Sequence, residues 1–204
     1  DERINEAFQP ISSFWEALIL HEFFGTGIPT IIFLLVGGAT FFTFYFGFIN
    51  NRIDWCIVEQ LLMKAIKLRF VGPINESAAQ SKIESLKKHE NFEYLSARDF
   101  KALDLDDVCC SIAPYDINIE SIKACTVSNR AFRLLSKGIP IIYPDLPYII
   151  NAPVEAISTA RSVDDYNKLI MFYKECFDKC QIEIEKFLPE HSEEARYRKF
   201  ETIL

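Results

Sequence analysis

The pattern of hydrophobic and polar positions divides the chain into two parts of different character. Residues 23–51 contain no Asp, Glu, Lys, Arg or His, a run of 29 residues, and about 20 apolar residues suffice to cross a bilayer. Residues 1–22 place apolar side chains at helical spacing, which predicts an amphipathic lead-in at a membrane surface. After Arg52, short apolar runs alternate with amphipathic stretches, as in an ordinary α/β chain.

The uncharged run predicts one transmembrane helix. Pro29 suits an early helix position, so we expect the membrane segment over residues 27–49, with its helix starting at Pro29. No Lys or Arg lies between Arg3 and Arg52, whereas basic residues follow Arg52 closely. The positive-inside rule then predicts a protein of the cytoplasmic membrane with its N-terminus outside and residues 52–204 in the cytoplasm. The acidic start does not fit a signal peptide.

The rest of the chain predicts strands that alternate with helices, which indicates parallel βαβ units. The expected strands are residues 68–72, 91–95, 108–113, 139–143 and 155–159. The expected helices are residues 57–66, 77–88, 128–137, 162–184 and 192–204, with only a helical turn or two over residues 97–105. Nearly continuous apolar strands are typical of a sheet covered on both faces. We therefore predict a Rossmann-like parallel sheet with flanking helices over residues 44–204, preceded by the membrane segment in residues 1–50.

Composition excludes several classes of function. The net charge of −7 and the pI near 5.1 argue against a nucleic-acid binder, which would carry a basic patch. The six cysteines show no spacing typical of a disulfide scaffold and fit a reducing cytosol. Cys176 and Cys180 share a helix face, but a metal pair there lacks two further ligands, so we expect no metal site.

Candidate binding residues follow three expected strands. In an open α/β sheet, ligands bind beyond the carboxyl ends of the strands, and here those ends are residues 47–52, 114–116 and 126–130. The last stretch leads into a helix, whose free backbone N–H groups can hold a phosphate. Ser128 and Asn129 would add side-chain contacts and Arg130 a positive charge. Ordinary helix capping explains the same residues without a ligand.

Four segments in order resemble the C-terminal domain of GT-B glycosyltransferases. The run NRAFRLLSKGIPII at residues 129–142 is similar to a segment that in this family commonly reads Asn-Lys-hydrophobic-Phe-Glu-Tyr-Leu-Ala-x-Gly-x-Pro-Val-Val. FGFINNRIDW at residues 46–55 resembles the first strand and loop of that domain, FVGPI at residues 70–74 its second strand, and DVCCSIAPY at residues 107–115 the strand before the donor loop. The resemblance covers residues 44–204.

The resemblance implies binding of a nucleotide-activated sugar, with no cofactor besides this substrate, for sugar transfer in glycan synthesis. Backbone N–H groups at residues 128–130 would neutralise the departing diphosphate. Arg133 stands where many members carry a Glu that contacts the ribose or the sugar. The family's acceptor domain, which usually carries the catalytic base, has no counterpart here, so we expect donor binding alone and name no catalytic residue. The implied donor-binding residues are Gly47, Asn50, Asn51, Arg52, Pro114, Tyr115, Ser128, Asn129, Arg130 and Arg133.

The N-terminal part has a second resemblance. NEAFQP at residues 5–10, GIP at residues 27–29 and LVGGATFFTFYFGFIN at residues 35–50 resemble the start and first membrane helix of sodium:alanine (AGCS) symporters. The two resemblances overlap near residues 46–50, and one stretch cannot be both a membrane helix and a sheet strand, so we hypothesise that the chain is a fusion joined at this stretch. Two alternatives to a glycosyltransferase domain therefore stay open: a symporter fragment joined to an unrelated soluble domain, and a non-enzymatic scaffold with a degenerate donor site.

Overall fold

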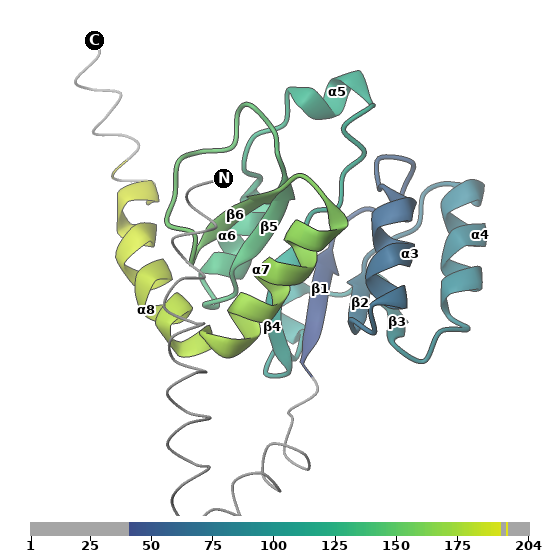
Figure 1. The fold of residues 1–204 in the computed structure, drawn as a ribbon, viewed down its shortest axis with the longest axis horizontal. Helices are drawn as coiled ribbons and strands as arrows, with labels where there is room; N and C mark the ends of the chain where they lie inside the picture. Colours follow the sequence, from purple (N-terminus) through teal and green to yellow (C-terminus); the bar gives the residue numbers. More distant parts are fainter. Residues whose placement is uncertain (1–40, 193–194, 196–204) are drawn as a thin grey trace, which may run out of the picture. The chain divides into compact units, whose positions relative to one another are not determined.

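The computed structural model describes residues 41–192 and residue 195. Contacts group the chain into residues 1–40 and residues 41–204, and the described residues belong to the second unit. Its six-stranded sheet has the order β3-β2-β1-β4-β5-β6, with every neighbouring pair parallel (Figure 1). This is a doubly wound, Rossmann-like order, so the predicted α/β fold is confirmed. The strands are β1 (Phe42–Phe46), β2 (Leu68–Val71), β3 (Phe92–Leu95), β4 (Val108–Ile112), β5 (Ile141–Pro144) and β6 (Ile157–Ala160).

Strand β1 corrects the expected membrane segment. Residues 42–46 form a central strand that pairs with β2 on one side and β4 on the other, so the prediction of a helix through residue 49 is wrong. Phe44 is fully buried between neighbouring strands and helices. The physical reason is that Phe, Tyr and Thr have high strand propensity, and a strand buried on both faces is an uncharged run in the sequence, just as a membrane helix is. Residues 1–40, which hold the rest of the expected span, lie outside the described residues.

No helix within residues 41–192 is both long enough and apolar enough to cross a bilayer. The helices α3 and α7 pack against each other on one face of the sheet, while α6 lies behind β5 in the view of Figure 1. The described helices are α3 (Trp55–Met63), α4 (Ser77–Leu86), α5 (Glu120–Lys123), α6 (Asn129–Leu135), α7 (Val163–Glu175) and α8 (Phe177–Phe187), with 3-10 turns η1 (Phe100–Ala102) and η2 (Leu188–His191).

Local departures from the predicted elements have simple reasons. The helical turn expected within residues 97–105 is present as the turn η1. The short helix α5 was not predicted. The long helix expected over residues 162–184 is divided at Cys176, whose φ of −112° and ψ of 27° leave the helical range. The helix expected over residues 192–204 lies almost entirely outside the described residues.

Because of the break at Cys176, the apolar side chains of α7 and those of α8 pack against different parts of the domain. Helix α7 packs on β4, β6 and α3. In α8, by contrast, Ile184 and Phe187 join a buried cluster with Ala131 and Leu135 of α6. A straight helix could not reach both surfaces. A second cluster joins Phe44, Val71, Val108, Leu134 and Ile139 across the centre of the sheet.

A capping box forms the start of α7. The Ser162 hydroxyl accepts from the Asp165 N–H at 3.2 Å, and the Asp165 carboxylate accepts from the Ser162 N–H at 3.1 Å. We expect Ser162→Ala to lower the free energy of unfolding by about 1 kcal/mol, because an N-terminal N–H loses its partner. Urea denaturation followed by circular dichroism measures this. Ser81→Ala, in the exposed interior of α4, should change stability by less than about 0.5 kcal/mol; equal losses in both variants would contradict the assignment.

Candidate functional site

The carboxyl edge of the sheet brings together the loops that follow β1 and β4. These are the two central strands, from which the strand order runs in opposite directions, and ligands of doubly wound sheets bind at this point. The loop after β1 is held rigidly on both sides. The Gly47 N–H donates to the Val71 carbonyl at 2.9 Å, the Asp54 N–H to the Pro114 carbonyl at 2.7 Å, and the Asp116 N–H to the Arg52 carbonyl at 2.8 Å.

Arg130 reaches this edge from the first turn of α6. Its guanidinium donates to the Phe46 carbonyl at 2.9 Å and to the Tyr115 hydroxyl at 3.0 Å, so it bridges the ends of β1 and β4. The side chain is half-buried, and none of the ion pairs among the described residues gives it a carboxylate partner. A guanidinium offers five N–H donors. A partly desolvated cation without a carboxylate is a candidate for binding an anionic ligand.

Two glycines allow close approaches at this edge of the sheet. A Cβ on Gly47 would lie 1.2 Å from Arg130 Nη1, and its φ of +149° also disfavours other residues. A Cβ on Gly72, at the end of β2, would lie 1.9 Å from the Gly47 carbonyl oxygen. Glycine at both positions therefore lets the two strand ends approach each other and leaves room for the guanidinium.

Three tyrosines surround the guanidinium with hydroxyl groups that stay protonated. Burial raises the pKa of Tyr45 to about 12, against the opposing effect of Arg130. Burial likewise raises the pKa of Tyr115 and of Tyr143, again opposed by the Arg130 charge. These neutral phenols supply hydrogen bonds without cancelling the positive charge of Arg130. Sequence analysis did not identify Tyr45 or Tyr143 as site residues, because Tyr45 lay in the expected membrane segment and Tyr143 in an expected strand.

The other predicted residues of the loop after β1 lie at the surface of this edge. Asn50 closes a tight turn, since its side-chain oxygen accepts from the Arg52 N–H at 3.0 Å. The Asn51 N–H donates to the Glu76 carboxylate at 3.1 Å. The side chains of Asn51 and Arg52 are exposed, whereas Pro114 is buried. Pro114 therefore positions the loop through its carbonyl, and Arg52 is left free to face solvent.

The other predicted residues of α6 and its cap lie in two environments. The Ser128 hydroxyl caps the helix by accepting from the Ala131 N–H at 3.4 Å, and the Ser128 N–H donates to the Tyr143 hydroxyl at 3.4 Å. Asn129 and Arg133 are exposed. Within the described residues, no hydrogen bond or ion pair connects Arg133 with Arg130 or Tyr115. The structure thus gathers Gly47, Tyr115, Ser128 and Arg130 and leaves Asn129 and Arg133 at the periphery.

A cavity of about 420 Å³ opens beside this cluster, on the face of the sheet that carries α3 and α7. We call it the α3–α7 cavity. Tyr115, whose hydroxyl accepts from Arg130, lines it together with Asp54, Cys56, Asn118, Asp145 and Arg161, among others. The cavity and the guanidinium therefore meet at Tyr115.

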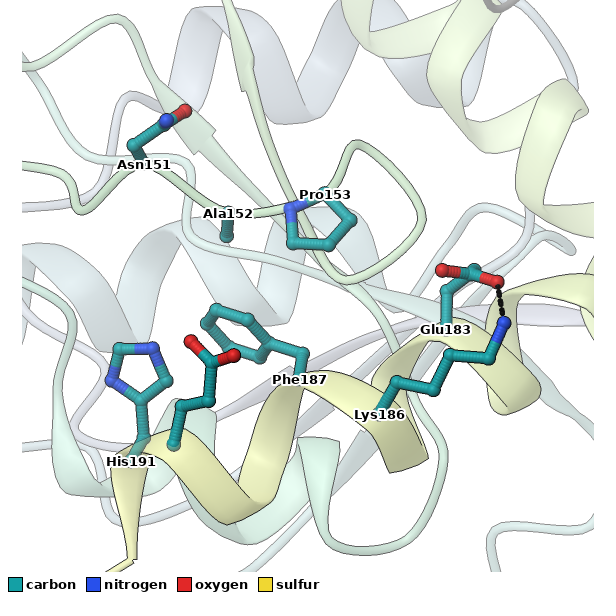
Figure 2. Close-up of a pocket in the computed structure, with 8 residues that line it drawn as sticks. Asn151, Ala152, Pro153, Glu183, Lys186, Phe187 and His191 are labelled. Atoms are coloured by element: carbon teal, nitrogen blue, oxygen red, sulfur yellow. Dashed lines mark hydrogen bonds and ion pairs between the residues drawn. The ribbon is translucent and has the colours of Figure 1, made fainter. Parts of the chain in front are cut away.

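A second hollow lies apart from the predicted residues. It has a volume of about 470 Å³ between helix α8 and the segment Asn151–Pro153 (Figure 2). Glu183 and Lys186 form an ion pair across one side at 2.6 Å, and the rings of Phe187 and His191 pack with their centres 4.3 Å apart. None of the predicted site residues lines this hollow.

Solved glycosyltransferase structures are similar to this chain in fold, but their sequence identity to it is low. No family model and no curated protein sequence matches it. The pneumococcal O-GlcNAc transferase GtfA, solved in complex with UDP and GlcNAc, has 10% identity and a TM-score of 0.49, with 80% of this chain and 36% of that chain covered. AviGT4, a glycosyltransferase involved in avilamycin A biosynthesis, has 11% identity and a TM-score of 0.44, with coverage of 74% and 50%.

The GtfA/B complex matches similarly, with 11% identity, a TM-score of 0.45 and coverage of 80% and 38%. The chain thus spans half or less of the length of these structures. The resemblance to symporters finds no support among them. All three TM-scores lie below 0.5, so these structures do not indicate a function for this chain, and the evidence for one comes from its own residues.

Proposed function

We propose that residues 41–204 are a nucleotide-sugar-binding domain of the GT-B glycosyltransferase type. The resemblance of residues 129–142, 46–55, 70–74 and 107–115 to that family supports the proposal. The parallel sheet supports it too, because its central switch point falls between β1 and β4, where the loops of that resemblance lie.

The placement of Arg130 carries the proposal. A diphosphate needs positive charge and N–H donors, and Arg130 brings both to the switch point without a competing carboxylate among the described residues. Gly47 leaves room for the guanidinium, because a Cβ there would lie 1.2 Å from Arg130 Nη1. An arginine that served only to stabilise the fold would more often pair with an acidic side chain, as Arg69 does with Asp107 at 2.6 Å.

The chemistry that follows is stabilisation of a leaving group. In sugar transfer the bond between the anomeric carbon and the diphosphate oxygen breaks, and the electron pair remains on the diphosphate. Arg130 would stabilise the transition state, in which this negative charge grows, more than it stabilises the ground state. Electrostatic catalysis lowers a barrier in this way. The acceptor hydroxyl, and the base that takes its proton, are assigned to a second domain or partner. We expect this chain alone to bind the donor without transferring the sugar.

Calorimetric titration of the full chain tests the proposal. We expect saturable binding of UDP or GDP and of the corresponding nucleotide-sugars, weakened by added salt because charge attraction contributes. Uridine and guanosine, which lack phosphate, are the matched controls and should bind more weakly by about tenfold or more, the equivalent of about 1.4 kcal/mol. Absence of heat with every nucleotide and nucleotide-sugar would refute donor binding.

A non-enzymatic scaffold with a degenerate site is the second candidate, and Arg133 is the observation that favours it. The exposed Arg133 stands where the resembling family commonly has a Glu. If the site is degenerate, Arg133→Glu should raise nucleotide-sugar affinity; if the donor is held in another way, the variant should leave affinity unchanged or lower it. Location at the cytoplasmic membrane concerns residues 1–40 and stays a prediction.

A further inference from the structure

The peptide group that joins Phe46 to Gly47 is held by hydrogen bonds at both ends. Its carbonyl accepts from Arg130 Nη1 at 2.9 Å, and its N–H donates to the Val71 carbonyl of β2 at 2.9 Å. The guanidinium lies directly against Gly47, since a Cβ there would be 1.2 Å from Nη1. The position of the guanidinium therefore depends on the orientation of this peptide plane, which is rigid in itself but can turn about the φ and ψ angles of the glycine.

The peptide group that joins Phe48 to Ile49 is held in the same way. Its N–H donates to the Pro73 carbonyl at 2.9 Å, and its carbonyl accepts from the Tyr45 hydroxyl at 2.7 Å. The Tyr45 side chain is only 3% exposed, and its ring packs against that of Phe70 in β2 with the ring centres 4.8 Å apart. Tyr45 is therefore a fixed anchor for the loop after β1, whereas the Phe48 side chain is exposed.

The conformational freedom of glycine links the Tyr45 hydrogen bond to the position of Arg130. Gly47 has a φ of +149°, and a residue without a Cβ does little to restrict its own backbone. The Tyr45 hydroxyl fixes the backbone on the far side of Gly47, and strand β1 fixes it on the near side. Tyr45 also lies close to the guanidinium. Burial raises the pKa of Tyr45 to about 12, while the charge of Arg130 and a hydrogen bond with it act in the opposite direction.

We propose that Tyr45 is a positioning residue for Arg130. Its hydroxyl fixes the loop that presents the Phe46 carbonyl, and this carbonyl together with the Tyr115 hydroxyl holds the guanidinium at the carboxyl edge of the sheet. Tyr45 is buried and already donates its proton to the Phe48 carbonyl, so it acts through Arg130 and not on a ligand directly. The inference rests on the proposed function, because this positioning affects binding only where Arg130 contacts the diphosphate.

Calorimetric titration of the full chain with UDP and with GDP separates this role from a purely structural one. Tyr45→Phe keeps the ring and removes only the hydroxyl. We expect it to weaken nucleotide binding about fivefold, the equivalent of about 1 kcal/mol and a usual net contribution of one hydrogen bond. In the Arg130→Met background the same substitution should weaken binding by less than about twofold, because the group through which Tyr45 acts is gone. A residue that only stabilised the fold would not show this dependence on Arg130.

Tyr173→Phe is the matched control for loss of a buried hydroxyl. Tyr173 is fully buried on α7, and its hydroxyl donates to the Val154 carbonyl. The variant thus loses the same kind of hydrogen bond in another part of the domain, and it should change nucleotide affinity by less than about twofold. Thermal unfolding of every variant verifies that it is folded.

Hydrogen exchange followed by NMR tests the positioning without any ligand. We expect Tyr45→Phe to speed exchange of the Gly47 and Ile49 amides about fivefold, because the loop that holds them opens more often. Tyr173→Phe should leave both rates unchanged. If the parent chain gives no heat with any nucleotide, the proposed function fails, whereas faster exchange in Tyr45→Phe still supports Tyr45 as the anchor of the loop.

Three results would overturn the inference. The first is equal nucleotide affinity of the parent chain and folded Tyr45→Phe, in a parent chain that binds nucleotide. The second is an equal effect of Tyr45→Phe with Arg130 present and with Arg130→Met, which would show that Tyr45 does not act through the guanidinium. The third is unchanged exchange of the Gly47 and Ile49 amides in Tyr45→Phe.

Discussion

Replacing Arg130 by methionine is expected to weaken nucleotide-sugar binding about thirtyfold or more. The guanidinium is the positive group that bridges the ends of β1 and β4, and hydrogen bonds to charged groups contribute about 1.5–3 kcal/mol each. A loss of about 2 kcal/mol corresponds to roughly thirtyfold in affinity. Methionine keeps much of the apolar stem, so packing around α6 should change little. Calorimetric titration of both chains gives the ratio directly.

The effect must be separated from the general loss of a positive charge and from misfolding. Lys137→Met removes a positive charge just beyond the end of the same helix, where the side chain is exposed, and should change affinity less than about threefold. Arg130→Lys keeps the charge but loses the bidentate geometry, so an intermediate loss is expected. Thermal unfolding of each variant verifies that it is folded. Equal affinities of the parent chain and folded Arg130→Met would remove the basis for the proposed site.

Replacing Gly72 by alanine is expected to lower the free energy of unfolding by about 3 kcal/mol or more. The new Cβ would lie 1.9 Å from the Gly47 carbonyl oxygen and 2.8 Å from its carbon, and both atoms belong to the backbone beside central strand β1. A backbone between two paired strands cannot move aside cheaply. The φ of +151° at Gly72 adds strain of order 1–3 kcal/mol for any residue with a Cβ. Urea denaturation followed by circular dichroism measures the loss.

Gly138→Ala is the matched control for Gly72→Ala. Gly138 also has a positive φ, of +72°, but its added Cβ would meet the flexible Gln181 side chain at 2.9 Å. The expected loss is about 1 kcal/mol, the usual strain of alanine in this conformation. A loss of less than about 1 kcal/mol in Gly72→Ala, or equal losses in both variants, would show that the close approach of Gly72 to Gly47 is not a constraint on the fold.

Much of the fold was predictable because strand and helix periodicity is local. The strands expected over residues 68–72, 91–95 and 108–113 are present within one or two residues, and their alternation with helices fixed the parallel sheet. The uncharged run was ambiguous because a strand buried on both faces and a membrane helix both exclude charge. Only tertiary pairing, of β1 with β2 and β4, decides between them for residues 42–46.

The candidate site was predictable in part for a similar reason. Strand ends and a helix start are readable from turn residues, so Gly47, Tyr115 and Arg130 could be proposed from sequence. Whether Tyr45 and Tyr143 point toward the site depends on the face of the sheet on which each side chain lies. A single sequence does not determine that face.

The most direct measurement of the central claim is a crystal structure of the full chain grown with a nucleoside diphosphate sugar. We expect the diphosphate at the carboxyl edge between β1 and β4, with its oxygens within about 3 Å of the Arg130 guanidinium. A nucleotide-sugar bound elsewhere on the domain, or a diphosphate without contact to Arg130, would contradict it.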